Sequence, residues 1–270
     1  MRLRNIWMSA LGLTLSVAVT ACGGGEETSS TSAEPAGSAT GAGAGGGAER
    51  IDPATAGSVM GIVSLDGTVP NNEPIRMNAD PVCLKQASGD QFQETFVVGA
   101  QGNTLGNVFV YVKDGLGNFA YDPPTGSVTL DQSGCRYRPH VFGIRVGQEL
   151  VIVNSDPTLH NVHATPANNT EFNNGQPIQG MKMTHVFTSP EVMLPFKCDV
   201  HGWMNAYVGV MDHPYFAVTA EDGKFELPGL PPGTYTIEAW HERLGTQTMS
   251  VTIGASETGE ANFTFQDPGA

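Results

Sequence analysis

Short segments in which apolar and polar residues alternate recur along most of the chain, and this period of two predicts β-strands. The clearest case is residues 107–114, where Val108, Val110 and Val112 share one face of a strand. No segment of helix length carries the corresponding helical period. The pattern therefore predicts an all-β protein.

The predicted strands fall into three consecutive blocks. The first begins at Gly57, includes residues 96–98 and 107–114, and ends where Asp122-Pro123-Pro124 interrupts the pattern. The middle block contains predicted strands at residues 127–130, 141–146, 149–154, 161–165, 183–188, 191–198 and 206–211. The last block contains predicted strands at residues 215–218, 225–227, 235–242, 249–253 and 261–265.

The first 54 residues have a different pattern. Arg2 and Arg4 precede an apolar run, residues 6–19, which is too short for a membrane span and is typical of an export signal. Residues 23–54 are rich in Gly, Ala, Ser and Thr and lack apolar periodicity. We therefore expect them to be a disordered tether with an average reach of about 30 Å.

Composition narrows the functional classes. The 270 residues leave room for one large domain or two ordinary ones. A formal net charge of −14 argues against a nucleic-acid partner, because an acidic surface repels phosphates. The chain also lacks a Gly-rich phosphate loop and a G-x-S-x-G nucleophile elbow, and its four cysteines are too few for a disulfide scaffold of this size.

One short motif carries metal chemistry. Residues 196–204, F-K-C-D-V-H-G-W-M, contain Cys198, His201 and Met204 at C-x2-H-x2-M spacing. The preceding predicted strand ends on its buried face at Cys198, so the following loop can fold back toward it. A thiolate, an imidazole and a thioether that converge on one point suit copper better than zinc, calcium or magnesium.

A second imidazole, His160, follows a buried strand and the polar turn N-S-D-P-T-L. The runs N-S-D-P-T-L-H-N-V and F-K-C-D-V-H-G-W-M together resemble the cupredoxin family, in particular its amicyanin- and plastocyanin-like type 1 copper domains. The resemblance implies a Greek-key sandwich with one copper, bound by His160, Cys198 and His201 with Met204 as the weak axial ligand. It also implies that Asn161 ties the two ligand loops together and that the ring edge of His201 lies at the surface.

Two further groups of possible ligands stay open. His163 lies three residues after His160, so on a strand it points to the opposite face. Met181, Met183 and His185 could form a second Cu(I) site, although their segment also resembles the strand that leads to the cysteine in cupredoxins.

The last block contains A-E-D-G-K-F-E-L-P-G-L-P-P-G-T-Y-T-I-E-A-W, which resembles the carboxypeptidase regulatory-like domain, a transthyretin-like sandwich. The first half of such a domain matches the segments around Val59 and Val110. We therefore expect a discontinuous transthyretin-like β-sandwich, residues 55–122 plus 213–267, with a cupredoxin domain, residues 123–212, inserted into it. Two tandem domains are the alternative.

The four cysteines can be assigned by context. The run V-T-A-C ending at Cys22 resembles the lipobox of bacterial lipoproteins, which implies a signal peptide at residues 1–22 and lipidation of Cys22. A secreted protein with a free Cys22 is the alternative. With Cys198 on copper, Cys83 and Cys135 remain in an oxidising compartment, and we expect them to form a disulfide. Separate thiols, or a second metal site with His140, are the alternatives.

These features predict a lipid-anchored, extracytoplasmic copper protein that carries single electrons. It would be periplasmic or face the cell surface, on the outer membrane if the source is Gram-negative, with a redox partner such as a cytochrome or an oxidase domain. The alternative is a module that stores, delivers or senses copper. We do not expect an enzyme, because the seven histidines include no H-x-H pair for a multicopper cluster and four protein ligands leave no open position.

Overall fold

The computed structural model describes residues 48–100, 103–266 and 269. The expected signal peptide, the lipidation site Cys22 and most of the expected tether therefore lie outside the described residues. Ordered structure begins before the expected end of the tether, because β1 (Glu49–Arg50) pairs in parallel with β6 (Phe119–Ala120). Among the described residues, no helix is long and apolar enough to cross a membrane.

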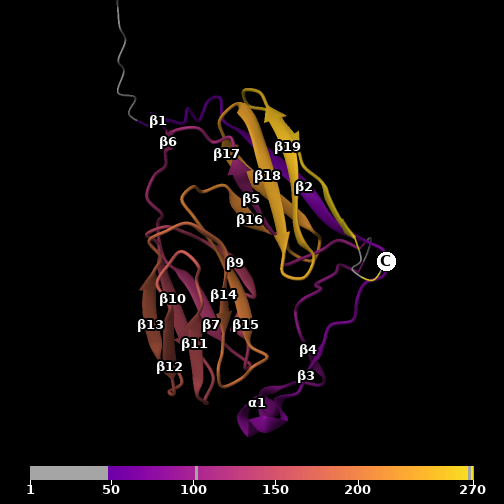
Figure 1. Ribbon diagram of the computed structural model, residues 1–270, viewed down its shortest axis with the longest axis vertical. Coiled ribbons are helices and arrows are strands. Elements are labelled where there is room, and N and C mark those ends of the chain that lie inside the picture. The colour runs from indigo at the N-terminus through magenta and orange to yellow at the C-terminus, as the bar shows by residue number, and fades with distance from the viewer. Residues whose placement is uncertain (1–47, 101–102, 267–268, 270) are drawn as a thin grey trace, which may run out of the picture. The chain divides into compact units, whose positions relative to one another are not determined.

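The expected all-β fold class is confirmed, and most strands belong to two sandwiches (Figure 1). The first has a four-stranded and a five-stranded sheet and is called here the copper sandwich, because it contains the motifs for which copper is expected. The four-stranded sheet has the order β13 (Lys182–Val186), β10 (Glu149–Asn154), β7 (Val128–Gln132), β8 (Tyr137–Arg138). The five-stranded sheet has the order β12 (Phe172–Gln176), β11 (His160–Ala164), β14 (Glu191–Lys197), β15 (Asn205–Met211), β9 (Val141–Arg145).

A bulge in β14 sets the face on which the metal motif begins. Met193 adopts φ 56°, and the pairing of β14 with β15 shifts in register between Glu191 and Leu194. After the bulge, the alternation of a strand directs Leu194 and Phe196 into the core. Cys198 continues this alternation and is buried at the end of the strand.

The second sandwich, called here the host sandwich, takes strands from both sides of the copper sandwich in sequence. One sheet has the order β16 (Phe216–Val218), β5 (Phe109–Asp114), β18 (Gly233–His241), β19 (Gly245–Ile253). The other has the order β17 (Lys224–Leu230), β2 (Gly57–Asp66), β20 (Thr258–Glu260), with β21 (Phe263–Gln266) also paired to β2. Strands that precede the copper sandwich in sequence thus pair with strands that follow it.

Two glycines allow the sandwiches to pack closely. Gly143 and Gly209 are register partners on β9 and β15. A Cβ at Gly209 would lie 2.2 Å from Phe109, and a Cβ at Gly143 would lie 2.3 Å from Phe216. The two phenyl rings, which come from the host sandwich, stack on each other with centroids 5.7 Å apart. Because these two glycines have no side chain, the rings of Phe109 and Phe216 can pack directly on the backbone of β9 and β15.

A long connection between β2 and β5, residues 69–98, is called here the strap. It contains β3 (Pro74–Ile75), a short 3₁₀ turn (Met77–Ala79), α1 (Pro81–Gln86) and β4 (Gln91–Phe92). The sequence assigned this segment to the host sandwich, but Ile75, Met77 and Cys83 are buried in the core of the copper sandwich. The strap therefore contributes to the hydrophobic core of the copper sandwich, although it connects two strands of the host sandwich.

Several bonds attach the strap to the copper sandwich. Cys83 in α1 and Cys135 in the turn between β7 and β8 form a disulfide, with an S–S distance of 1.99 Å. The Arg136 guanidinium donates to the carbonyl oxygen of Phe92 at 2.6 Å, and the Gln93 side chain donates to the carbonyl oxygen of Trp203 at 3.2 Å. Trp203 belongs to the C-x2-H-x2-M motif, so the strap is bonded directly to that motif.

Removal of the disulfide tests how much the strap contributes to stability. The bond closes a loop with a sequence separation of 52. We expect Cys83→Ala/Cys135→Ala to lower the free energy of unfolding by about 4 kcal/mol, the value that the chain-entropy model assigns to such a loop. Denaturant unfolding measures it, with Leu84→Ala as the control, because Leu84 lies in the same helix and is 56% exposed. An unfolding midpoint equal to that of the control would contradict the expectation.

Candidate metal centre

The four expected ligands come from two loops at one end of the five-stranded sheet. Cys198 follows β14, Met204 precedes β15, and His201 lies between them. His160 is the first residue of β11. All four side chains are buried. Two backbone hydrogen bonds close this loop. The peptide N–H of Cys198 donates to the carbonyl oxygen of Met204 at 3.1 Å, and the peptide N–H of Met204 donates to the carbonyl oxygen of His201 at 2.9 Å.

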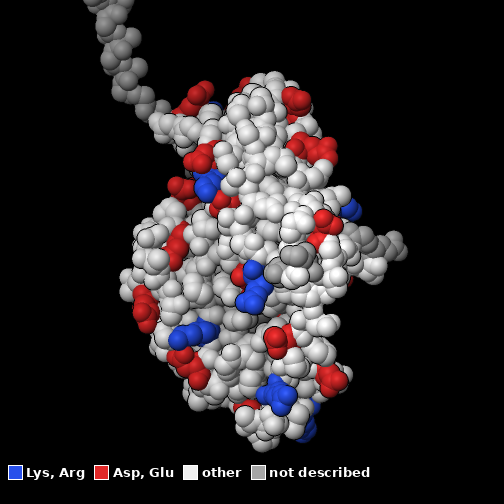
Figure 2. Space-filling view, turned by 45° about the vertical axis from the view of Figure 1, so that its right-hand side comes forward, with Lys and Arg blue, Asp and Glu red and all other residues white. Residues whose placement is uncertain are grey.

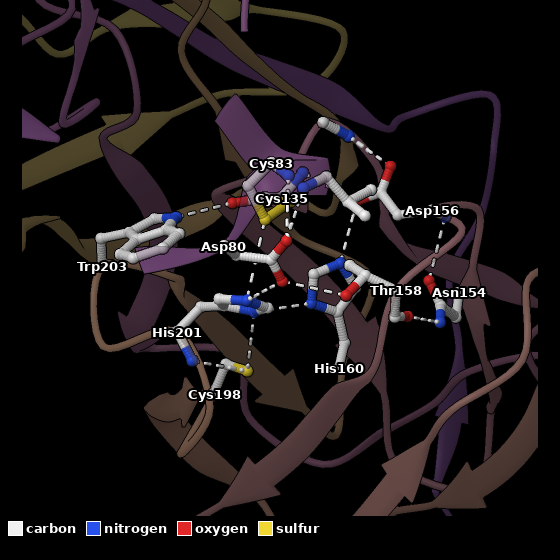
Figure 3. The surroundings of a disulfide bond; sticks show 12 residues. Asp80, Cys83, Cys135, Asn154, Asp156, Thr158, His160, Cys198, His201 and Trp203 are labelled. Carbon is white, nitrogen blue, oxygen red and sulfur yellow. Dashed lines mark hydrogen bonds and ion pairs between the residues drawn. A yellow bond between two sulfur atoms is a disulfide. The ribbon is translucent and has the colours of Figure 1, made fainter. Parts of the chain in front are cut away.

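The donor atoms converge on one point. The Nδ1 atoms of His160 and His201 lie 2.9 Å apart, and the Cys198 Sγ lies 3.9 Å from the Nδ1 of His201 (Figure 3). One sulfur and two ring nitrogens of these residues all lie within 4.8 Å of one another. Met204 is buried in the same core cluster as Cys198. The structure thus brings together the residues that the two motifs predicted.

Asn161 joins the two loops, as the resemblance implied. Its Oδ1 accepts from the peptide N–H of Asp199 at 2.7 Å, from that of Val200 at 3.3 Å, and from the Cys198 thiol at 3.3 Å. Its Nδ2 donates to the Asn173 side chain at 2.7 Å. Because Asn161 directly follows His160, this amide sets the distance between the two ligand loops.

A carboxylate lies behind each histidine. The Nε2 of His160 lies 2.9 Å from Asp156, and the Nε2 of His201 lies 3.0 Å from Asp80 (Figure 3). A carboxylate accepts hydrogen bonds, so both Nε2 atoms are assigned as donors. This tautomer leaves both Nδ1 lone pairs directed at the common centre.

The expectation that the ring edge of His201 lies at the surface is wrong. The residue is only 3% exposed. Its outer edge faces Asp80 and the Cys83 sulfur, which lies 3.7 Å from Nε2, and both belong to the strap. The partly exposed ring of Trp203 packs beside it, with centroids 5.0 Å apart.

The surroundings lower the pKa of Cys198 and of His201, which favours their metal-binding forms, whereas a metal at His160 has to displace a proton. Burial would raise the pKa of the Cys198 thiol, but a hydrogen bond to His160 and bonds to backbone groups lower it below its ordinary value. Burial would also lower the pKa of His160, but its contacts with Asp156 and Cys198 raise it to about 9. Burial lowers the pKa of His201 in spite of Asp80. The lowered pKa makes the thiolate, the form that metals bind, easier to reach at Cys198 than in an ordinary cysteine.

This donor set fits copper. Two imidazoles and one thiolate with a thioether nearby form the trigonal set with a weak axial methionine that copper takes in blue-copper sites. The carboxylates face the outer nitrogens, so hard oxygen ligands do not enter the centre. The two other clusters of potential ligands in the described residues each include Cys83 or Cys135, whose sulfurs are engaged in the disulfide.

His163 lies apart from this centre. Its Nδ1 lies 2.9 Å from Asp199, and its Nε2 lies 2.9 Å from Glu171. Both ring nitrogens are therefore engaged on the outer side of β11, the face expected from the spacing.

The other candidate ligands, in the segment of Met181 and His185 and at His140, make contacts that do not involve a metal site. The His185 ring packs against Phe172 and Phe187, with centroids 4.2 and 4.7 Å apart, and burial lowers its pKa. Met181 is largely at the surface. His140 bonds to the Glu242 side chain at 2.7 Å and to the carbonyl oxygen of Asn205 at 3.2 Å, not to Cys135.

The sequence analysis missed Asp80, Asp156 and Trp203 as parts of the site. Asp156 had a local signal, because it lies in the turn four residues before His160. Asp80 had a weaker one, because the order Asp-Pro is typical of a helix start and does not indicate a metal centre.

Comparison with known proteins agrees with both expected resemblances. Residues 204–266 match the model of the carboxypeptidase regulatory-like domain. Similar solved structures include a mutant of amicyanin in its Cu(I) form, with 20% identity over 33% of this chain and 86% of that chain and a TM-score of 0.29. A purple cupredoxin from Nitrosopumilus maritimus has 23% identity over 31% of this chain and 99% of that chain, with a TM-score of 0.27.

A Cu-containing nitrite reductase from Thermus scotoductus SA-01 is also similar, with 23% identity over 36% of this chain and a TM-score of 0.30. The similarity spans only 24% of that enzyme. No curated protein matches the chain. The family model is thus that of the carboxypeptidase regulatory-like domain, and the solved structures include cupredoxins.

Substitution of the two histidines of H-N-V-H, one at a time, tests which of them binds the metal. We expect His160→Ala to weaken copper binding by more than about 100-fold, since loss of a donor should exceed the 10–100-fold cost of losing an outer-shell partner. His163→Ala should leave the affinity unchanged, because its ring points away from the centre. Competition with a chelator of known affinity measures both. Loss of copper from the His163 variant alone would mean that the strand faces were assigned wrongly.

Proposed function

We propose that this protein carries single electrons with one type 1 copper site, in which His160, Cys198 and His201 are the strong ligands and Met204 is the weak axial ligand. The observation that carries the proposal is the buried convergence of the Cys198 sulfur and one ring nitrogen from each of the two histidines within 4.8 Å. Bound copper would accept one electron and release it again.

The protein holds these donors in a rigid frame. Asn161 receives hydrogen bonds from three groups on the Cys198 loop, and a carboxylate lies behind each imidazole. Donors that are fixed from the outside change position little when the charge of the metal changes. A site of this kind needs little reorganisation, which favours fast electron transfer.

We do not propose an enzymatic role for this centre. All four candidate ligands are buried, and the strap covers His201. A substrate would therefore have no open coordination position to occupy. Storage or delivery of copper is the second candidate, but the burial of the ligands and the covering strap oppose easy release, so we favour electron transfer.

Electrons would leave through Trp203 and not through the edge of His201. The strap closes that edge, whereas the Trp203 ring contacts the His201 ring and is partly exposed. The indole is also held in place, because its Nε1 donates to the carbonyl oxygen of Cys135 at 2.9 Å. Trp203 would thus connect the buried centre with the surface.

The location and the partner are further parts of the proposal. Lipidation at Cys22 would anchor the chain to a membrane outside the cytoplasm, on the outer membrane in a Gram-negative cell. The formal charge of −14 favours a basic redox partner, such as a cytochrome or an oxidase domain. On the face in Figure 2, acidic side chains are spread widely and the basic ones do not gather into a patch.

The visible spectrum tests the copper assignment. Copper-loaded protein should have an intense blue or greenish band from thiolate-to-Cu(II) charge transfer and a narrow copper hyperfine splitting in EPR. Cys198→Ser should abolish the band, because a hydroxyl does not replace a soft thiolate. A Cys198→Ser variant that keeps the band would show that Cys198 is not the thiolate ligand.

Trp203 variants test the route. Trp203→Leu should slow electron self-exchange several-fold, measured by NMR line broadening in mixtures of Cu(I) and Cu(II) protein, because it removes the ring between His201 and solvent. Trp203→Phe, which keeps a ring, should be slowed less. The reduction potential serves as the control for an intact centre. Equal exchange rates in wild type and Trp203→Leu would exclude this route.

A further inference from the structure

The strap places a carboxylate against the outer nitrogen of His201, beside the metal centre. Asp80 is the N-cap residue of α1 and is far from the metal motifs in sequence, yet its Oδ2 lies 3.0 Å from the Nε2 of His201. Its side chain is 17% exposed. Nothing in the copper motifs themselves requires a charged group at this position.

The two oxygens of Asp80 have separate roles. Oδ1 accepts from the peptide N–H groups of Val82 at 2.7 Å and Cys83 at 3.3 Å, which caps the helix. Oδ2 faces His201 and also accepts from the Thr158 hydroxyl at 2.9 Å. The cap therefore uses one oxygen and leaves the other for the imidazole.

Asp156 has the same arrangement behind His160. Its Oδ1 accepts from the peptide N–H of Gly134 at 2.9 Å, and its Oδ2 accepts from that of Cys135 at 2.7 Å while lying 2.9 Å from the Nε2 of His160. The Cys83 and Cys135 amides each hold one of the two carboxylates, and the disulfide joins these residues (Figure 3). The disulfide thus links the supports of both histidines.

Elementary electrostatics gives the consequence for the metal. A carboxylate that accepts a hydrogen bond from the outer N–H of an imidazole fixes the ring and makes its other nitrogen a stronger donor. A negative charge near a partly buried centre is weakly screened and stabilises the more highly charged metal ion. Both effects favour Cu(II) over Cu(I).

We propose that Asp80 is a positioning residue for the copper centre: its carboxylate orients His201 through Nε2 and, together with Asp156 behind His160, lowers the reduction potential of the site. This inference rests on the proposed function. It makes the strap a part of the copper site, although this segment connects two strands of the host sandwich, β2 and β5.

The substitution Asp80→Asn separates this role from helix capping. Asparagine caps a helix about as well as aspartate, so its Oδ1 can keep the bonds to Val82 and Cys83. The amide then directs an NH₂ group at His201, and a second donor cannot replace the carboxylate oxygen. Asp90→Asn is the matched control, because it removes the same charge from an exposed position of the strap.

Potentiometric titration of copper-loaded full-length protein is the main measurement. We expect Asp80→Asn to raise the reduction potential by about 59 mV or more, which corresponds to a tenfold change in the ratio of Cu(II) to Cu(I) affinity for one electron. Asp90→Asn should leave the potential at the wild-type value. The visible band should persist in both variants, with a changed copper hyperfine splitting only in Asp80→Asn.

A second measurement does not need the oxidised centre. In the diamagnetic Cu(I) protein, ¹⁵N NMR should find the proton of His201 on Nε2 and hydrogen-bonded in the wild type, with that hydrogen bond lost in Asp80→Asn. Thermal unfolding should be alike in Asp80→Asn and Asp90→Asn if the cap is kept.

The outcomes are distinguishable. A wild-type protein without a type 1 spectrum overturns the proposed function and this inference with it. A normal wild-type spectrum with the same potential in Asp80→Asn and Asp90→Asn overturns the role of Asp80 and leaves the copper assignment intact. A raised potential with an unaltered His201 signal also overturns the positioning role, because charge alone would then account for the shift.

Discussion

The amide of Asn161 is the contact on which the geometry of the centre depends most. It is bonded covalently to His160 and receives hydrogen bonds from the Cys198 loop at three positions, so it holds two loops that are 37 residues apart in sequence. The neighbouring strands β11 and β14 pair only at His163 and Ala164, so sheet pairing alone does not extend to the ligands. The side-chain amide replaces the missing backbone ladder at this end of the sheet.

The strap makes the two sandwiches interdependent. Its apolar residues lie in the core of the copper sandwich, and its aspartate lies against His201. Its disulfide joins α1 to the turn between β7 and β8, and amides of these two segments support the carboxylates. Packing of Phe109 and Phe216 over Gly143 and Gly209 adds a second contact between the sandwiches. A substitution in the strap or at the contact between the sandwiches can therefore alter the candidate metal centre without changing a candidate ligand.

Local pattern was sufficient for most strands and for the candidate ligands, but not for the segments that cover the ligands. The C-x2-H-x2-M motif and the alternation of β14 located Cys198, because both depend on neighbours in the chain. The edge strand β12 was missed because Asn173 and Asn174 interrupt its apolar pattern and only Gln176 is buried. The burial of His201 was missed because it depends on Asp80, 121 residues away, and no local pattern predicts that the strap crosses to the other sandwich.

X-ray absorption at the copper edge tests the central claim most directly, because it reports the atoms bound to the metal in the full-length protein. The account predicts one copper per chain with one short copper–sulfur distance and two imidazole nitrogens in the first shell, in both oxidation states and with little change between them. A first shell of nitrogen and oxygen only, or a large change of distances on reduction, would contradict it.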